Sequence, residues 1–218
     1  MPSDLTPAKQ LLSSKYTAIV IILIASIGVY LNTLPNEFVY DDEYQVLGNH
    51  WIRDVKYVPE IFFSDVWAFE GKENPSNYYR PLMHIIYMID YHIFGLKPWG
   101  FHLTNILFHG GVTLLVYLIA SILINQSHDL NFKSHPEQVG TNSKSKILNP
   151  KSQILNPALI SAVLFAAHPI HTEAVTWIGG IHEISFTLFY LLSFYFYMAA
   201  LPGSAPYINS NKRWGKGF

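Results

Sequence analysis

The sequence predicts an all-α integral membrane protein with about four transmembrane helices and an outer loop that carries short membrane-surface helices. Half of the 218 residues are hydrophobic and 13% are charged, whereas a soluble domain carries about 25% charged residues. The charges are also absent from four long windows, and a helix that crosses a bilayer needs about 20 mostly apolar residues. The windows without Asp, Glu, Lys or Arg are Tyr16–Asn36, Pro98–His128, Ser152–Thr172 and Ile184–Asn211.

The composition also excludes several classes of protein. The formal net charge of −1 excludes a polybasic protein that binds nucleic acid. The absence of cysteine excludes a disulfide scaffold, a zinc finger and a thiol nucleophile. No nucleic-acid partner is therefore expected.

The first predicted span covers residues 16–34 and follows a short cytoplasmic segment, 1–15. Its apolar run, TAIVIILIASIGVYL, comes after Lys9 and Lys15, as the core of a signal peptide would. The run is at the upper limit of such a core, however, and no A-x-A-like cleavage site follows it. A retained signal anchor is therefore the favoured interpretation.

Three more spans are predicted, at 100–124, 154–170 and 184–201. The third is the weakest, because Asn156-Pro157 and His168-Pro169 enclose only 10 interior residues. Residues 125–153 separate spans two and three and contain most of a duplicated heptad, which reads KSKILNP at 144–150 and KSQILNP at 151–157. Their Ser, Asn, Pro and Lys content without periodicity predicts a disordered cytoplasmic loop.

The positions of lysine and arginine predict the orientation in the membrane. With the N-terminus in the cytoplasm, the outer segments are 35–99 and 171–183, and the tail 202–218 is cytoplasmic. This arrangement puts nine of the 14 basic residues inside and 12 of the 15 acidic residues outside. We expect a multi-pass protein of the plasma (inner) membrane with a cytoplasmic N-terminus.

The apolar stretch Leu82–Phe94 competes as a fifth span. It is too short to cross a bilayer and contains Asp90, and counting it would turn the lysine-rich loop outward. We interpret it instead as an amphipathic helix over residues 81–95 on the outer membrane surface. Pro81 suits its first turn and Gly95 its end.

Three adjacent carboxylates, Asp41, Asp42 and Glu43, follow the first span by a few residues. Like charges this close raise one another's pKa, which can leave one carboxylate ready to accept a proton. The alternative is a solvated acidic turn or a helix N-cap. The residues alone favour the second interpretation.

Two further groups of polar residues stand beside predicted spans. Arg80 opens the expected surface helix, where a guanidinium either holds a phosphate by bidentate hydrogen bonds or only extends to the interface. His168, His171 and Glu173 match no standard metal-site spacing, so a polar loop is favoured over a metal site. Within span two, His102 and His109 are predicted to hydrogen bond to a neighbouring helix.

Four motifs together resemble a known family. FVYDDEYQVLGN, NYYRPL, LKPWGFHLTNILFH and LFAAHPIHTEAVTWI occur in the order seen in the transmembrane-and-tetratricopeptide-repeat O-mannosyltransferases and their bacterial relatives, which are GT-C-type glycosyltransferases. The resemblance covers roughly residues 16–200. It implies a partial GT-C fold of the bacterial type.

The resemblance also implies a mechanism. A GT-C enzyme takes a sugar, here a mannose-like hexose, from a polyisoprenyl-phosphate donor in the membrane lipid and transfers it to a protein or glycan hydroxyl on the outer side. Asp41 or Asp42 is then the general base, and Glu43 or Asp42 positions the acceptor or a metal. Arg80 binds the donor phosphate. The residues expected to line the same site are Tyr79, His84, His168, His171 and Glu173. No cofactor is implied with certainty, and a divalent metal is left open.

The length sets the remaining alternatives. Members of the family continue with more spans and a C-terminal array of repeats, whereas no such repeat pattern occurs in this sequence. We expect the N-terminal portion of a glycosyltransferase. The alternative is a non-enzymatic, truncated membrane scaffold of the same fold, and a transporter is disfavoured because the spans carry no Asp or Glu.

Overall fold

The computed structural model describes residues 15–71, 76–134 and 156–201. Every regular element within these ranges is a helix, and they contain no strand. The all-α prediction is therefore confirmed for this part of the chain. Most of the expected cytoplasmic N-terminus and loop, nearly all of the duplicated heptad and the tail from residue 202 lie outside the described residues.

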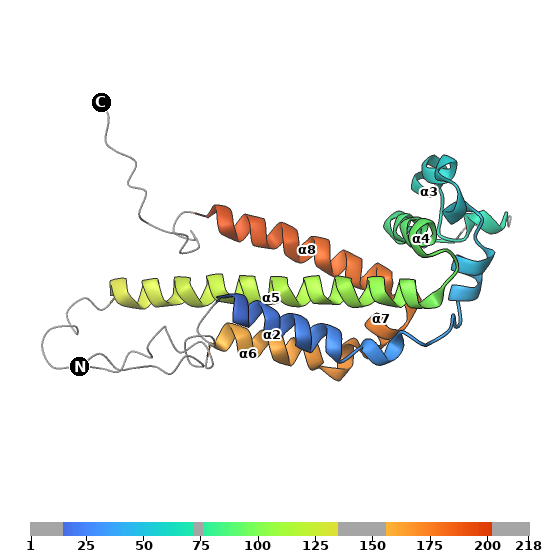
Figure 1. The fold of residues 1–218 in the computed structure, drawn as a ribbon. Helices are drawn as coiled ribbons and strands as arrows, with labels where there is room; N and C mark the ends of the chain where they lie inside the picture. The colour runs from blue at the N-terminus through green and yellow to red at the C-terminus, as the bar shows by residue number, and fades with distance from the viewer. Residues whose placement is uncertain (1–14, 72–75, 135–155, 202–218) are drawn as a thin grey trace, which may run out of the picture.

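Four helices form an elongated bundle in which successive helices run in opposite directions (Figure 1). They are α2 (Lys15–Gly28), α5 (Pro98–Ser134), α6 (Pro157–Ala167) and α8 (Ile181–Ala200). Three stretches within the described residues are long and apolar enough to cross a membrane: Tyr16–Thr33, Pro98–Ile124 and Ile178–Ala200. A bent pair of helices gives a fourth if the pair is counted as one span. The prediction of about four spans agrees with this count.

The third predicted span is broken in the structure. α6 ends at Ala167, a short 3-10 turn covers Pro169–His171, and α7 (Thr172–Thr176) continues at an angle of 47°. His168 is extended (φ −71°, ψ 128°) because the ring of the following proline disfavours the helical conformation. The segment expected to be a short outer loop, 171–183, is thus mostly helical.

The second span is longer than the sequence predicts. We expected it to end at residue 124, but α5 continues as one helix to Ser134, so the first part of the expected disordered loop is helical. α5 packs against α2, α6 and α8 and forms the centre of the bundle. Ala18 and Ile22 of α2 pack with Ala162 of α6, and small residues at such contacts let helices approach closely.

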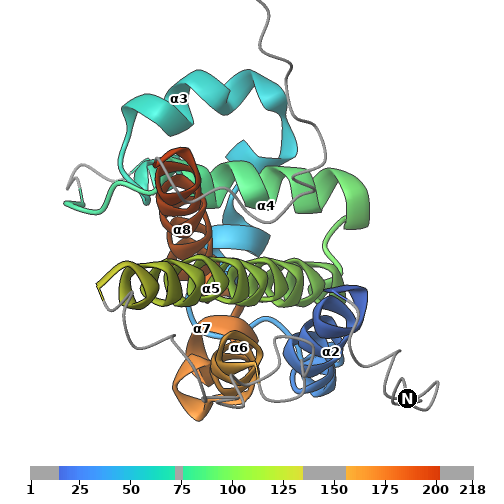
Figure 2. The ribbon, with the colours of Figure 1, turned by 90° about the vertical axis from the view of Figure 1, so that its left-hand side faces the viewer.

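The described residues between 35 and 97 form a cap at one end of the bundle (Figure 1). Its elements are η2 (Glu43–Gly48), η3 (Trp51–Arg53), η4 (Val55–Tyr57), α3 (Val58–Phe63), η5 (Ala68–Glu70) and α4 (Pro81–Phe94). The cap has its own hydrophobic core, in which Ile52, Met83 and Tyr87 are fully buried. α4 is seen end-on in Figure 1 and across the view in Figure 2, so it lies across the bundle axis.

α4 begins and ends where the sequence predicts. Pro81 occupies the first turn, and Gly95 ends the helix with a positive φ of 65°, a conformation that glycine adopts without strain. One face of the helix buries Met83 and Tyr87 in the cap, whereas Ile89 and Ile93 are exposed on the opposite face. That this apolar face lies on the membrane surface stays a prediction.

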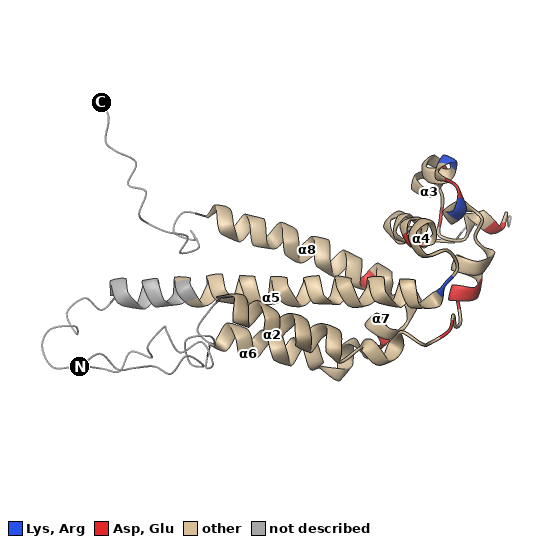
Figure 3. Cartoon of the chain, in the orientation of Figure 1, with Lys and Arg blue, Asp and Glu red and all other residues tan. Residues whose placement is uncertain are grey.

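The described charges gather at the cap end (Figure 3). The described parts of the bundle helices are almost free of charged residues (Figure 3). The exceptions are acidic residues in α7 and at the start of α8. The bundle therefore presents apolar walls and one polar end, and any polar chemistry belongs at that end.

Candidate functional site

An open cavity of about 830 Å³ lies at the junction of the bundle and the cap. Its volume is within the range of small-molecule sites, about 300–1,000 Å³. The wall is formed by the segment after α2, by the first turns of α5 and by α7 and its end. The lining residues are Asn36, Glu37, Val39, Tyr40, Asp41, His102, Glu173, Thr176 and Trp177.

Asp41 and Asp42 are neighbours in opposite environments. Asp41 is exposed and lines the cavity. Asp42 is only 1% exposed, and its two carboxylate oxygens accept hydrogen bonds from the backbone N–H of Gly179 (3.0 Å) and of Val39 (3.2 Å). Burial raises the pKa of Asp42 to about 6, although both N–H bonds oppose the shift. The free carboxylate is therefore Asp41, and Asp42 joins two distant segments of the chain.

Asp42 bonds to Gly179 in the turn formed by Trp177, Ile178 and Gly179, and two other helices also hold this turn. The amide nitrogen of Asn105 on α5 donates to the carbonyl of Trp177 (2.7 Å). The hydroxyl of Tyr87 on α4 donates to the carbonyl of Ile178 (3.4 Å). These bonds satisfy backbone groups that burial would otherwise leave unpaired, and they hold Trp177 in the cavity wall.

Glycine is required immediately after this turn. A Cβ atom on Gly180 would overlap the backbone of Ala174 in the preceding helix. Without a side chain, the backbone after α7 can turn back against α7 before α8 begins. The Gly179-Gly180 pair therefore permits the close approach that positions the cavity wall.

Tyr40 stores backbone strain beside Asp41. Its φ of 55° lies in the left-handed region that non-glycine residues seldom adopt, at a cost on the order of 1–3 kcal/mol. The hydrogen bond from the N–H of Asp42 to the carbonyl of Val39 (3.1 Å) closes the turn around it. Residues held in such conformations cluster at functional sites, and this one orients the next residue, Asp41.

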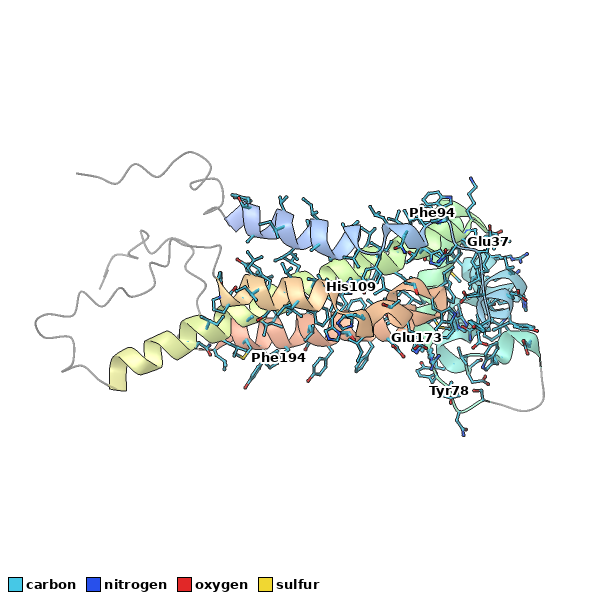
Figure 4. All side chains as sticks on the ribbon, turned by 90° about the horizontal axis from the view of Figure 1, so that it is seen from below. Glu37, Tyr78, Phe94, His109, Glu173 and Phe194 are labelled. Atoms are coloured by element: carbon cyan, nitrogen blue, oxygen red, sulfur yellow. The ribbon has the colours of Figure 1, made fainter. Side chains whose placement is uncertain are left out.

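The cavity unites two of the predicted site residues. Asp41 comes from the segment after α2 and Glu173 from α7. Figure 4 shows Glu173 and Glu37 toward the cap end of the molecule, whereas His109 lies further along the bundle. Glu43 is exposed as the first residue of η2 and does not line the cavity.

Three predicted residues lie in the cap and outside the cavity lining. The guanidinium of Arg80 lies over the ring of Tyr78 at 5.1 Å and has no acidic partner within 4 Å among residues 15–71, 76–134 and 156–201. The hydroxyl of Tyr79 donates to the carbonyl of Phe62 (2.8 Å). His84 is 2% exposed, meets Phe69 edge-on, and has its pKa lowered to about 4 by burial. The expectation that His84 lines the site does not match this buried position in the cap core.

His168 and His171 mark the break between α6 and α7. The ring of His171 packs on Phe165, with centroids 4.2 Å apart, and lies 5.6 Å from the ring of His109. His168 Nδ1 accepts a hydrogen bond from the N–H of Ile170 (3.2 Å), which caps the short turn that follows. Neither residue lines the cavity, and the described residues hold no group of three or more His, Asp or Glu arranged to bind a metal.

Several residues that shape the site were missed at the level of sequence. Glu37, Tyr40 and Thr176 line the cavity, and Asn105 and Tyr87 hold its wall. A polar residue within an apolar span is a functional candidate by default, and this rule would have found Asn105. The tyrosines and the glutamate have no comparable signal in the sequence.

Comparisons with known proteins agree with the motifs. No family model and no solved structure matches the chain. It is 30% identical over 173 residues to protein O-mannosyl-transferase TMTC2 of Homo sapiens, which covers 79% of this chain and 17% of the relative. It is 33% identical over 171 residues to protein O-mannosyl-transferase tmtc2 of Xenopus laevis, a match that covers 78% of this chain and 17% of that protein. It is 30% identical over 186 residues to protein O-mannosyl-transferase Tmtc3 of Drosophila melanogaster, a match that covers 84% of this chain and 19% of that protein. The chain therefore spans less than a fifth of the length of these relatives.

Proposed function

We propose that this chain forms the sugar-transfer site of a membrane glycosyltransferase. The transfer runs from a polyisoprenyl-phosphate-linked sugar to a hydroxyl of a protein or glycan. The observation that carries the proposal is the exposed Asp41 in an open cavity where the apolar bundle meets the cap. The similarity to proteins named protein O-mannosyl-transferases supports a hexose such as mannose as the sugar.

In the proposed reaction, Asp41 acts as the general base. Its carboxylate accepts the proton of the acceptor hydroxyl while that oxygen forms a bond to the anomeric carbon of the sugar. The bond between the anomeric carbon and the phosphate oxygen breaks, and its electron pair leaves with the polyisoprenyl phosphate. Asp41 then releases the proton to water, which the open cavity admits.

Asp42 serves this reaction as a positioning residue. Its buried carboxylate links the segment that carries Asp41 to Gly179, which lies 137 residues further along the chain in the turn that also carries Trp177. The two walls of the cavity therefore keep a fixed separation. Such preorganisation is a large part of what an enzyme contributes to a reaction of this kind.

Arg80 is the proposed contact for the leaving phosphate. It stands at the start of α4 without an acidic partner among the described residues, so its hydrogen-bond donors are available. A guanidinium stays charged and binds a phosphate through two parallel hydrogen bonds. In this arrangement the acidic cavity receives the neutral sugar, and the phosphate stays outside it toward α4.

The setting in the cell is also part of the proposal. The cap faces the outer side of the plasma (inner) membrane, the N-terminus is cytoplasmic, and the apolar face of α4 rests on the lipid. The distribution of basic residues supports this orientation, because they are concentrated in the segments predicted to be cytoplasmic and not in the cap. A relationship to the bacterial type of the family is likewise proposed, on the motifs alone.

A transfer assay tests the proposal. Membranes that contain the protein are supplied with a polyprenyl-phosphate-linked hexose and a Ser/Thr peptide. Asp41→Asn removes the proton acceptor, so transfer should fall about 10²- to 10⁴-fold. Glu43→Gln is the matched control, because Glu43 is an exposed neighbouring carboxylate outside the cavity lining. Full activity of Asp41→Asn would refute the assignment of the base.

A further inference from the structure

Trp177 is a half-buried aromatic residue in the wall of the cavity, between α7 and α8. Its backbone is engaged on both sides, because its N–H donates to the carbonyl of Glu173 (3.1 Å) and its carbonyl accepts from Asn105 (2.7 Å). Its indole nitrogen is closed off from solvent. The part of Trp177 that meets the cavity is therefore the rest of its ring.

Two neighbours fix the orientation of that ring. The indole nitrogen lies beside the carboxylate of Asp42. The same edge of the ring packs on Gly179, where a Cβ atom would come within 2.4 Å of Cζ2 of Trp177. Gly179 is also the residue whose N–H donates to Asp42 (3.0 Å). The nitrogen edge is thus held by a buried carboxylate and a bare backbone, so the ring is oriented before any ligand binds.

Trp67 in the cap shows what a structural tryptophan does in this protein. It is also half-buried, but it packs against the ring of Phe69, with centroids 6.1 Å apart, and it does not line the cavity. Trp177 makes no ring contact with an aromatic residue within the ranges 15–71, 76–134 and 156–201. The face of its indole is therefore not covered by another ring.

The rest of the lining indicates what can lie on this ring. Three carboxylates, Glu37, Asp41 and Glu173, line the same cavity, and a carboxylate only accepts hydrogen bonds. No Lys or Arg is among the described residues that line it, so a phosphate would be repelled. A pyranose matches both features, since its rim carries hydroxyl donors and its faces carry C–H bonds, which the negative face of an aromatic ring attracts.

We infer that Trp177 is the platform on which the hexose lies, with a C–H face of the sugar against the indole and its hydroxyl groups available to the carboxylates of the cavity. The inference rests on the proposed function in one respect, since the choice of a hexose over another cyclic polyol comes from it. Trp177 determines specificity and takes no part in proton transfer. Asp42 gains a second task, because the carboxylate that fixes the segment of Asp41 also lies against the platform.

The experiment measures binding without catalysis. The chain is reconstituted in lipid nanodiscs, its aromatic protons are saturated selectively, and saturation transfer to the methyl α-pyranosides of mannose, glucose and galactose is recorded by NMR. The C–H protons on one face of the preferred hexoside should receive the strongest saturation. Trp177→Leu should reduce this signal and raise the dissociation constant about 5- to 10-fold, as expected when an aromatic contact is lost.

Two variants control for the loss of a tryptophan. Trp177→Phe keeps an aromatic face but not the nitrogen beside Asp42, and its dissociation constant should stay within about threefold of the wild type. Trp67→Leu removes a half-buried tryptophan outside the cavity lining and should leave the dissociation constant within about twofold. Thermal unfolding of the same samples gives the folded fraction, so binding is counted per folded molecule. Asp41→Asn should keep hexoside binding even though it loses transfer, so the inference and the proposed function fail separately.

Several results would overturn the inference. Wild-type hexoside affinity in Trp177→Leu, or an equal loss in Trp67→Leu, would remove the special role of Trp177. Equal losses in Trp177→Phe and Trp177→Leu would assign the effect to the indole nitrogen and not to the ring face. The absence of hexoside binding by the wild type, or stronger saturation of N-acetyl-threonine amide than of any hexoside, would rule out a sugar platform, and the second result would indicate an acceptor site.

Discussion

The cavity and the core of the cap lie at the same end of the molecule, yet polar residues differ between them in exposure and in hydrogen bonding. In the cavity, Asp41 is exposed, and the carboxylates of Glu37 and Glu173 line the same space. In the cap core, Asp90 and Tyr87 are buried, and each makes a hydrogen bond to another element. Residues from the same sequence motifs are found in both regions. The surroundings of a residue, and not its motif, therefore distinguish a group available for chemistry from one that holds the fold.

Within the cap, the largest expected effect concerns Arg80, the residue proposed to bind the donor phosphate. Arg80→Ala should raise the KM for the polyprenyl-phosphate donor by about 10- to 100-fold, since a charge-assisted hydrogen bond to phosphate is lost. The measurement is the donor dependence of transfer in membranes that contain the protein.

Arg53→Ala is the control for that variant. The Arg53 guanidinium already donates to the carbonyl of Leu47 (2.6 Å), so it is engaged in the cap. Its replacement should leave the donor KM within about twofold. If both variants change the KM equally, the cap acts as a general positive surface and Arg80 has no special role.

Asp90 should give the stability of the cap a pH dependence. Thr104 donates to its carboxylate (2.6 Å), but burial raises its pKa to about 7. Between about pH 4 and 7, the folded protein retains a proton on Asp90 that the unfolded chain has released. The contribution of Asp90 to stability therefore decreases as the pH rises through this window.

Asp90→Asn should isolate that contribution. The amide oxygen can still accept from Thr104, and no charge is buried above pH 7. The variant should be more stable than the wild type by about 2 kcal/mol or more at pH 8 and nearly equal at pH 4. Thermal unfolding at the two pH values measures the change. A difference between variant and wild type that does not depend on pH would contradict the role of the Asp90 charge.

The smallest effect is expected at His84. Burial lowers its pKa to about 4, and its Nε2 has no hydrogen-bond partner in the described part of the chain. His84→Leu should therefore keep transfer at the wild-type rate and change stability at pH 7 by less than about 1 kcal/mol. It should also remove a loss of stability below about pH 6.5, where the unfolded chain gains a proton. A large loss of transfer would return His84 to the site.

Much of the fold could be predicted from the sequence because the bilayer imposes simple rules. The apolar windows gave the bundle helices, and Pro81 and Gly95 bounded α4. The bend at His168-Pro169 was not predicted as a bend, although the weak third span pointed to it. The continuation of α5 to Ser134 was missed because the predicted span ended where the apolar residues end. The polar residues that follow are still compatible with a helix.

The site could be predicted only in part. The acidic motif located Asp41, but sequence adjacency could not separate it from Asp42, since burial depends on a contact with Gly179 137 residues away. The same limit applies to the two histidines of the second span, since His102 lies beside the backbone of Asn36 and Thr176 and His109 is bonded to the carbonyl of Ala166. Contacts between distant segments decide both cases.

The most direct test of the account compares Asp41→Asn with Asp42→Asn in the same preparation, by thermal unfolding and by transfer per folded molecule. Asp41→Asn should unfold within about 2 °C of the wild type and lose transfer at least about 100-fold. Asp42→Asn should unfold several degrees lower, because an amide N–H then faces a backbone N–H of Val39 or Gly179. The opposite pattern, with Asp41→Asn active and Asp42→Asn stable but inactive, would contradict the account.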